Sequence, residues 1–435
     1  MNAKWLSTLL IVLVVTLRWS LAWSQPETLL YPPNATFTTK AITPFAIEGL
    51  TMDARRDFYT TGRQTDTTKK CPVWRINANS ATRVSVGFIP NSLAAPCNPS
   101  GIAFDSMGNL YIADAASPGS VWKVSPDPTG CASDDSTSSV CTAIANSTSS
   151  SPTNPFAKVV PGTNGVAFDR DGNLWTGDGT TGLGRVWKIG LGGGDCTLRA
   201  ETNCEEVFRI QPMNNSVAFE GDVPNPGVGR VNSTIQPPQP GLPQGSVNPQ
   251  NLVANGLAFN TDGDLFVADT ARGALWQVKF ESDGTLKSHV GCDETFHPNT
   301  LCLNHIFVAD PRLEGADGIA LDQNGNIWVS INERNAIVIF GKGVSAEVFR
   351  NPMNPNSRLR NSSATGEGNK KILEFPTSPF LLGNQFCTAN SDGNRRDNSP
   401  NTDGEVNSSG PVGLRGKISC MDQDLTSPGL PLPVQ

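Results

Sequence analysis

The sequence predicts an all-β fold, a six-bladed β-propeller with four-stranded antiparallel blades and disulfide-stapled loops. Three observations support this prediction. The 435 residues include 42 Gly and 33 Pro, which is too rich in turn formers for a helical bundle. A short motif recurs six times along the chain. Ten cysteines fall in neighbouring couples, which is typical of an exported chain with local bridges.

The repeat is clearest in four copies that align without gaps, at residues 100–114, 164–178, 255–269 and 317–331. Weaker copies begin at Glu48 and Ser378. Each copy holds an apolar run, a D/N-x-x-G-N/D turn and a second apolar run, and further apolar runs follow. Alternating runs and turns are typical of consecutive hairpins. Four strands repeated six times can close into a ring, which leaves few exposed sheet edges.

Two features inside the repeat invite a functional interpretation, and we favour a structural one for each. The D-x-x-G-N element is shorter than an EF-hand loop and lacks its closing Glu, so we expect a hairpin turn capped by Asp or Asn. One repeat position carries a tryptophan in three copies, Trp122, Trp187 and Trp276. We expect these rings to pack between blades.

The N-terminus reads as a secretory signal peptide over residues 1–24. A basic start precedes the apolar run Leu9–Leu17, and Ala22-Trp23-Ser24 supplies a small-x-small cleavage site. We therefore expect a secreted mature protein. Residues 25–44 form an N-terminal segment that could close the ring, and the propeller spans 45–425 with a long Pro-rich insertion at about 211–250. Residues 426–435 are expected to be a flexible tail.

The cysteine spacing predicts five local disulfides, and C-x-x-C spacing typical of thiolate metal sites is absent. The expected pairs are Cys71 with Cys97, Cys131 with Cys141, Cys196 with Cys204, Cys292 with Cys302, and Cys387 with Cys420. Three of these couples would staple the loop between the third and fourth strands of a blade. Six N-x-S/T sequons would be glycosylated only in a eukaryotic host: Asn34, Asn146, Asn214, Asn232, Asn361 and Asn407.

Charge and histidine content exclude several classes of function. The net charge of −7 and a pI near 5.1 disfavour binding to nucleic acid or to an anionic membrane surface. The chain has three His, all between residues 289 and 305. A Ser-His-Asp triad or a metal site with several His ligands is therefore disfavoured.

The candidate site is the position just before the repeat glycine. In a propeller this residue begins the innermost strand and can lie at the mouth of the central channel. The six residues at this position are Glu48, Ser100, Asn164, Asn255, Asp317 and Ser378. All six carry a side-chain oxygen, and converging oxygens are what a hard cation such as Ca²⁺ requires. The alternative is a solvated channel lined by turn-capping groups.

Three of these motifs resemble the SMP-30/gluconolactonase/LRE-like family of six-bladed propellers. They are Glu48-Gly49-Leu50, Asn255-Gly256-Leu257 and Asp317-Gly318-Ile319, in the family's order and in blades one, four and five. The resemblance covers roughly residues 45–390. It implies a divalent metal held by Glu48, Asn255 and Asp317, and we expect Ca²⁺ because all the ligands are oxygens. Asn164-Gly165 resembles the family's N-D-G motif, whose polar residues contact substrate or metal-bound water.

A cation at this position would polarise a carbonyl and activate a water molecule. The sequence therefore favours a hydrolase of a small lactone or ester, with Asp317 as the base and Asn164 orienting substrate or water. Two alternatives stay open. One is a non-enzymatic, NHL-like binding propeller in which the ring holds a structural ion or none. The other is a strictosidine-synthase-like propeller, for which no counterpart of the catalytic Glu of a later blade is evident.

Overall fold

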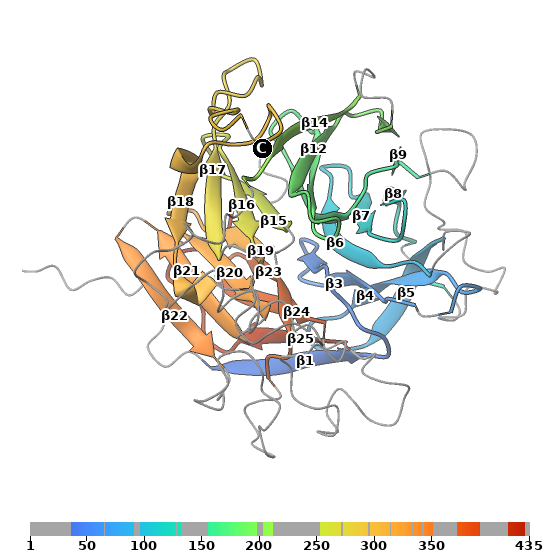
Figure 1. Cartoon of the computed structure of the whole chain (residues 1–435). Helices are drawn as coiled ribbons and strands as arrows, with labels where there is room; N and C mark the ends of the chain where they lie inside the picture. Colours follow the sequence, from blue (N-terminus) through green and yellow to red (C-terminus); the bar gives the residue numbers. More distant parts are fainter. Residues whose placement is uncertain are drawn as a thin grey trace, which may run out of the picture.

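Six β-sheets surround one central axis in the structure, a computed structural model (Figure 1). The predicted six-bladed β-propeller is therefore confirmed. The described residues are 36–64, 66–90, 96–127, 129–131, 155–197, 203–211, 253–270, 273–294, 296–313, 315–332, 335–341, 343–350, 372–391 and 416–430. The signal peptide, the insertion at about 211–250 and all six sequons lie outside these residues, apart from Gln211 at the edge of the insertion.

Blades one to three take their strands in chain order, with the innermost strand first. Blade one contains β2 (Thr51–Met52), β3 (Phe58–Thr61), β4 (Cys71–Ile76) and β5 (Arg83–Ile89). Blade two contains β6 (Pro99–Phe104), β7 (Leu110–Asp114), β8 (Ser120–Val124) and β9 (Ala157–Lys158). Blade three contains β10 (Thr163–Phe168), β11 (Leu174–Asp178), β12 (Arg185–Ile189) and β14 (Cys204–Arg209). The short β13 (Gly194–Asp195) adds a parallel fifth strand to blade two.

Blades four and five follow the same plan. Blade four contains β15 (Ala254–Phe259), β16 (Leu265–Asp269), β17 (Ala274–Val278) and β18 (Ile306–Ala309). Blade five contains β19 (Ala316–Leu321), β20 (Ile327–Ile331), β21 (Ala336–Gly341) and β22 (Val344–Arg350). Two short 3-10 helices, η1 (Leu303–His305) and η2 (Pro311–Leu313), flank β18. Across the described residues, no helix has the length and apolar character needed to cross a membrane.

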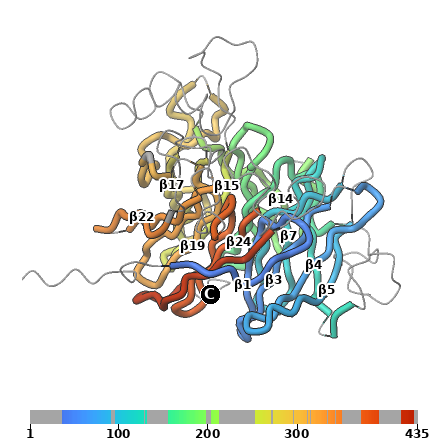
Figure 2. Tube along the Cα trace, turned by 90° about the horizontal axis from the view of Figure 1, so that it is seen from below, coloured from blue at the N-terminus to red at the C-terminus, as the bar shows by residue number. Residues whose placement is uncertain are grey.

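Blade six joins the two ends of the chain. Its inner strands are β23 (Pro376–Leu382), β24 (Gln385–Asn390) and β25 (Gly416–Met421), and its outermost strand is β1 (Phe37–Thr43). β1 is antiparallel to β25, with Phe37 opposite Met421. Figure 2 shows β1, in blue, beside the red C-terminal part of the chain. The ring is thus closed by a strand from the N-terminal segment, which ties the first described residues to the last blade.

The turn of the repeat has the structure that its sequence predicts. Asp105 Oδ1 accepts hydrogen bonds from the backbone N–H groups of Met107 and Asn109, at 2.9 and 2.8 Å. Gly108 follows with φ of 83°, a left-handed conformation that glycine adopts without strain. Asp169 accepts the equivalent bonds in blade three. The Asp and Gly of this motif therefore close hairpins between the first two strands.

Apolar side chains fill the spaces between neighbouring blades. Trp276 of blade four is fully buried in a cluster that includes Trp175 and Phe208 of blade three. Trp122 and Trp187 are likewise buried against their neighbours. The expectation that these tryptophans pack between blades is confirmed, so they are not a surface for stacking ligands.

Four of the five predicted disulfides are present, namely Cys71–Cys97, Cys196–Cys204, Cys292–Cys302 and Cys387–Cys420. The fifth prediction, Cys131–Cys141, involves a residue outside the described part of the chain. Two of the four staple the loop between the third and fourth strands of a blade, as expected. Cys387–Cys420 instead links two adjacent strands, β24 and β25, in the blade that closes the ring.

Residues 426–430, the first part of the tail that we expect to be flexible, contact the propeller. The backbone N–H of Gly429 donates to Gly383 and that of Leu430 donates to Leu321, at 2.8 and 3.0 Å. The Leu430 side chain is buried and lines the central channel. An apolar side chain that enters an apolar channel gains burial free energy, and this burial helps to hold the segment against the propeller.

Candidate active site at the channel mouth

The innermost strand of five blades carries a β-bulge at the same place. In blade two, Pro99 pairs with Asp114 and Ile102 pairs with Ile112, so two residues of β6 lie opposite one residue of β7. The same irregularity occurs in β10, β15, β19 and β23. A bulge bends its strand and redirects side chains. The two bulged residues are the repeat glycine position and the residue before it, which explains why the latter leaves the sheet pattern.

Five of the six predicted ring residues, all except Ser378, are buried and follow one another around the axis. A Cβ built on Gly49 would lie 2.2 Å from the carbonyl oxygen of Ser100, and one built on Gly256 would lie 2.5 Å from that of Asp317. The same contact with the next blade, at 2.4 Å, is made by Gly101, Gly165 and Gly318. Glycine is required here because the backbones of neighbouring blades touch. The residues before these glycines therefore form a closed sequence from blade to blade.

The sixth position belongs to Thr377 and not to Ser378. β23 pairs with β24 so that Pro376 is opposite Asn390 and Pro379 is opposite Thr388, which aligns Thr377 with the ring residues of other blades. Ser378 takes the place of the repeat glycine. Thr377 Oγ1 donates to the carbonyl oxygen of Glu48 at 2.6 Å and so completes the ring. The degenerate sixth copy lacks the glycine that marks the register elsewhere.

Two ring hydroxyls are engaged in structural hydrogen bonds. Ser100 Oγ donates to the carbonyl oxygens of Thr163 and Asn164, at 3.3 and 3.2 Å, while Thr377 bonds to Glu48 as described. For these two positions the structural interpretation holds, because each hydroxyl ties one blade to the next. The side chains of Glu48, Asn164, Asn255 and Asp317 are the remaining candidates for chemistry.

A second tier of residues supports the ring, and sequence reasoning missed it. These residues follow the second strand of each blade, 15 positions after the ring residue in blades one to five and 14 positions after Thr377 in blade six. Asn255 Nδ2 donates to Thr270 Oγ1 at 3.3 Å, and Asn332 Nδ2 donates to Asp317 Oδ2 at 2.9 Å. In blade one the same spacing joins Arg63 Nη2 to Glu48 Oε2 in an ion pair. The spacing of 15, shared by blades one to five, was a signal that the repeat already offered.

In blade three the second-tier residue is Gly179. A Cβ on Gly179 would lie 2.3 Å from Nδ2 of Asn164, so the amide of Asn164 lies directly over the glycine. Asn332 is also notable because it is buried while its Oδ1 has no hydrogen-bond partner among the described residues. A buried amide oxygen without a partner is costly in a folded protein. Asn332 Oδ1 can therefore accept a further hydrogen bond next to Asp317.

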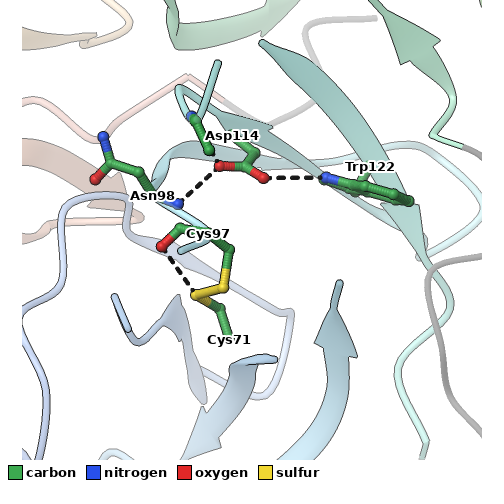
Figure 3. The surroundings of a disulfide bond; sticks show 6 residues. Cys71, Cys97, Asn98, Asp114 and Trp122 are labelled. Atoms are coloured by element: carbon green, nitrogen blue, oxygen red, sulfur yellow. Dashed lines mark hydrogen bonds between the residues drawn. A yellow bond between two sulfur atoms is a disulfide. The ribbon is translucent and has the colours of Figure 1, made fainter. Parts of the chain in front are cut away.

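The electrostatics of the mouth depend on a few charged groups. Glu48 and Asp317 supply negative charge, and Arg63 supplies a positive charge next to Glu48. Asp114 lies at the end of β7 (Figure 3), where its carboxylate accepts from the backbone N–H of Asn98 at 2.8 Å and from Trp122 Nε1 at 3.4 Å. Burial raises the pKa of the Asp114 carboxyl, and these bonds and the charge of Arg63 oppose the rise.

Below the ring the channel becomes apolar. A cavity of about 110 Å³ is lined by the innermost strands of all six blades and by Leu430. Its lining includes the repeat glycines but none of the six residues of the ring. Charged and amide side chains of the ring are therefore concentrated at one mouth of the channel, and the described lining of the interior holds no carboxylate.

The donor set suits a hard divalent cation in type. Glu48 and Asp317 contribute carboxylates and Asn255 an amide oxygen, whose orientation is set by the bond from Nδ2 to Thr270. Within the described residues there is no group of three His, Cys, Asp or Glu side chains that could hold a metal. The predicted ligands Glu48, Asn255 and Asp317 would not form such a group, because Asn255 offers an amide oxygen.

The histidines lie away from the mouth. His305 Nε2 accepts a hydrogen bond from the backbone N–H of His289 at 2.7 Å, in the loop region around the Cys292–Cys302 bridge. Burial and the neighbouring His289 and Lys279 charges lower the pKa of His305. This favours the neutral ring that can accept the bond.

Comparison with known proteins gives one family match and several similar structures. Residues 245–356 match the family described as SMP-30/Gluconolactonase/LRE-like region. A search of curated proteins found no match. A luciferin-regenerating enzyme is 12% identical, with 91% of this chain and 97% of that chain aligned at a TM-score of 0.48. The calcium-binding protein regucalcin of Agrobacterium tumefaciens is 12% identical, with 89% and 92% aligned at a TM-score of 0.45.

The matched segment contains blade four, blade five and two of the three motifs on which the resemblance was based. Asn255-Gly256-Leu257 and Asp317-Gly318-Ile319 both lie inside it. The first motif, at Glu48, lies outside the matched segment. It belongs to the same ring of residues, which the hydrogen bond from Thr377 to Glu48 completes. Residues 245–356 of this six-bladed propeller thus match the SMP-30/gluconolactonase/LRE-like region in sequence.

Proposed function

We propose that the mature protein is a secreted, metal-dependent hydrolase of a small lactone or ester. The observation that carries this proposal is the polar ring at one channel mouth, with Glu48, Asn255 and Asp317 in blades one, four and five. Secretion is supported by the N-terminal sequence and by the four described disulfides, which persist in oxidising compartments. The acidic net charge agrees with a small-molecule substrate and disfavours nucleic acid.

Glu48, Asn255 and Asp317 would hold the cation, and their all-oxygen donor set favours Ca²⁺. A divalent cation, when bound, supplies polarisation of the substrate carbonyl and a more acidic water. Asp317 would accept the proton from that water, and Asn332 would keep the Asp317 carboxylate in one orientation through the bond from Nδ2 to Oδ2. Asn164, whose amide lies over Gly179, would orient the substrate or the water.

A lactone suits this arrangement because its carbonyl is accessible and its leaving alkoxide stays tethered after ring opening. Attack by water on the carbonyl carbon breaks the acyl C–O bond, and the alkoxide takes up a proton. The product is a hydroxycarboxylate. An ester would react in the same way and release a separate alcohol.

The test is a panel of aldonolactones, aromatic lactones and small esters assayed with and without a chelator. Asp317→Ala should lower kcat by at least about a hundredfold because a ligand and a base are lost together. Asn255→Ala should mainly weaken cation binding. Ser378→Ala is the matched control, since the register moves Ser378 off the ring, and it should act like the parent protein. If Ca²⁺ binds through the ring yet no panel member reacts, the non-enzymatic binding propeller becomes the better description.

A further inference from the structure

Arg63 occupies the second-tier position of blade one, and it is the one charged residue among the second-tier residues. The corresponding residues of blades two to six are Ala115, Gly179, Thr270, Asn332 and Ser391. The backbone N–H of Arg63 donates to the carbonyl oxygen of Ala46 at 2.8 Å, which ties Arg63 to the segment that leads into Glu48. The guanidinium is therefore held against the Glu48 carboxylate by the same register that joins Asp317 to Asn332.

The ion pair meets the needs of a buried carboxylate. Side-chain exposure is 10% for Glu48 and 19% for Arg63, so both charges are largely removed from water. A carboxylate in this environment is costly without a counter-ion. Arg63 supplies that counter-ion within the chain. It also takes up Glu48 Oε2, one of the oxygens that a cation would use.

A divalent cation at Glu48 would compete with Arg63 for the same carboxylate. A guanidinium and a divalent cation on the same carboxylate repel, and the repulsion is stronger at a partly buried site than in water. A monovalent cation carries no more charge than the guanidinium and lacks its directed hydrogen bonds, so it cannot replace Arg63 effectively. A divalent cation brings twice the charge and can also bind Asp317 and Asn255.

We infer that Arg63 is a built-in counter-ion that competes with external cations for Glu48 and thereby sets the affinity and charge selectivity of the channel mouth. The inference rests on the proposed function, because it takes the ring to be the cation site. Two consequences follow. Removal of the Arg63 charge should tighten divalent-cation binding, and it should also let monovalent cations compete for the site.

The test is calorimetric titration of the full mature protein with CaCl₂, at low and at high KCl. Arg63→Gln removes the charge and keeps a hydrogen-bond donor, and Arg63→Thr copies the residue at the equivalent place in blade four. Both variants should bind Ca²⁺ at least about tenfold more tightly than the parent, because the competing charge is gone. KCl should weaken Ca²⁺ binding more in the variants than in the parent.

Arg312→Gln is the matched control, because it makes the same change in net charge at an ion pair outside the ring. Arg312 donates to Asp310 Oδ1 and Oδ2 at 2.9 and 2.7 Å and to the Ser345 carbonyl oxygen at 3.1 Å. This variant should bind Ca²⁺ as the parent does. Near-UV circular dichroism checks the folding of each variant, and the rise in thermal midpoint on adding Ca²⁺ gives a second measure of binding.

The possible failures are distinguishable. If Glu48→Gln abolishes Ca²⁺ binding but Arg63→Gln and Arg63→Thr bind with parental affinity, the ring is the cation site and the competition inferred for Arg63 is refuted. If neither the parent nor the two Arg63 variants binds Ca²⁺, the proposed cation site is itself wrong, and the inference is overturned with it. If Arg312→Gln tightens binding as much as Arg63→Gln does, the effect comes from net charge and again contradicts the inference.

Discussion

Replacement of Gly256 by alanine should separate two blades and disturb the ring at the same time. A Cβ at this position would lie 2.5 Å from the carbonyl oxygen of Asp317, 2.6 Å from Gly318 Cα and 2.7 Å from Ile319 N. Ordinary contacts begin near 3.4 Å, so the overlap with the carbonyl oxygen is about 0.9 Å. All three obstructing atoms belong to the backbone, and no side-chain rotation can relieve the overlap.

The expected cost of Gly256→Ala is about 3 kcal/mol of unfolding free energy, at the upper end of what overpacking costs in protein cores. Urea unfolding followed by tryptophan fluorescence measures it, because Trp175 and Trp276 are buried between blades three and four. Since blade five must move away from blade four, Asp317 should also shift relative to Asn255. Ca²⁺ binding should therefore weaken in protein that is still folded.

Gly190→Ala is the matched control. A Cβ on Gly190 would meet its nearest neighbour, Asn203 Cα, at 3.6 Å, and its φ lies outside the left-handed region. The same chemical change should therefore leave the unfolding free energy within about 1 kcal/mol of the parent, with a gain possible from lower backbone entropy of the unfolded chain. If Gly256→Ala unfolds at the same urea concentration as Gly190→Ala, the close approach of the blades is not required and our account of the ring is refuted.

Two further predictions follow from the disulfides and from Tyr59. Removing Cys387–Cys420, which spans 33 residues, should lower the unfolding free energy by about 3.7 kcal/mol through loop entropy. Removing Cys196–Cys204, which spans 8 residues, should lower it by about 2.5 kcal/mol. Urea unfolding of the two double alanine variants tests this order, and equal losses would contradict it. Burial and the nearby Asp53 charge raise the pKa of Tyr59 to about 12. Because the folded value exceeds the unfolded value of about 10, the contribution of Tyr59 to stability should be complete below pH 10 and decline between pH 10 and 12. A spectrophotometric tyrosinate titration against Tyr59→Phe measures this, and ionisation of Tyr59 near pH 10 would be the opposing result.

The ring shows how a repeated backbone defect can build a site. Each bulge displaces two residues from strand pairing, and the glycine lets the next blade come close. The residue before it is then held by two blades at once. Ser100 and Thr377 use this position to bond neighbouring blades, whereas Asn255 and Asp317 bond to second-tier residues of their own blade. The same backbone thus supports both structural and chemical roles.

Much of the fold was accessible from the sequence because the repeat is local. Apolar runs, the Asp-capped turn and the following glycine are contiguous, so each hairpin could be predicted from its own residues, as Asp105 and Gly108 illustrate. The disulfides followed because four of the couples close loops or hairpins near in sequence. Resemblance to the SMP-30/gluconolactonase/LRE-like family depended on three short motifs, two of which lie in the matched segment.

Only the tertiary structure decided how these local units meet. Thr377, and not Ser378, completes the ring because strand pairing sets the register where no glycine marks it. Leu430 is anchored because an apolar channel exists for it to enter, which composition could not reveal. The ion pair of Arg63 with Glu48 joins residues that flank the first two strands of blade one and lie 15 apart in sequence. The sequence by itself determined the repeated hairpins and their oxygen-bearing residues, because both depend on local patterns. The hydrogen-bond and ion-pair partners of these residues depend on register and packing across strands and blades, which only the closed ring defines.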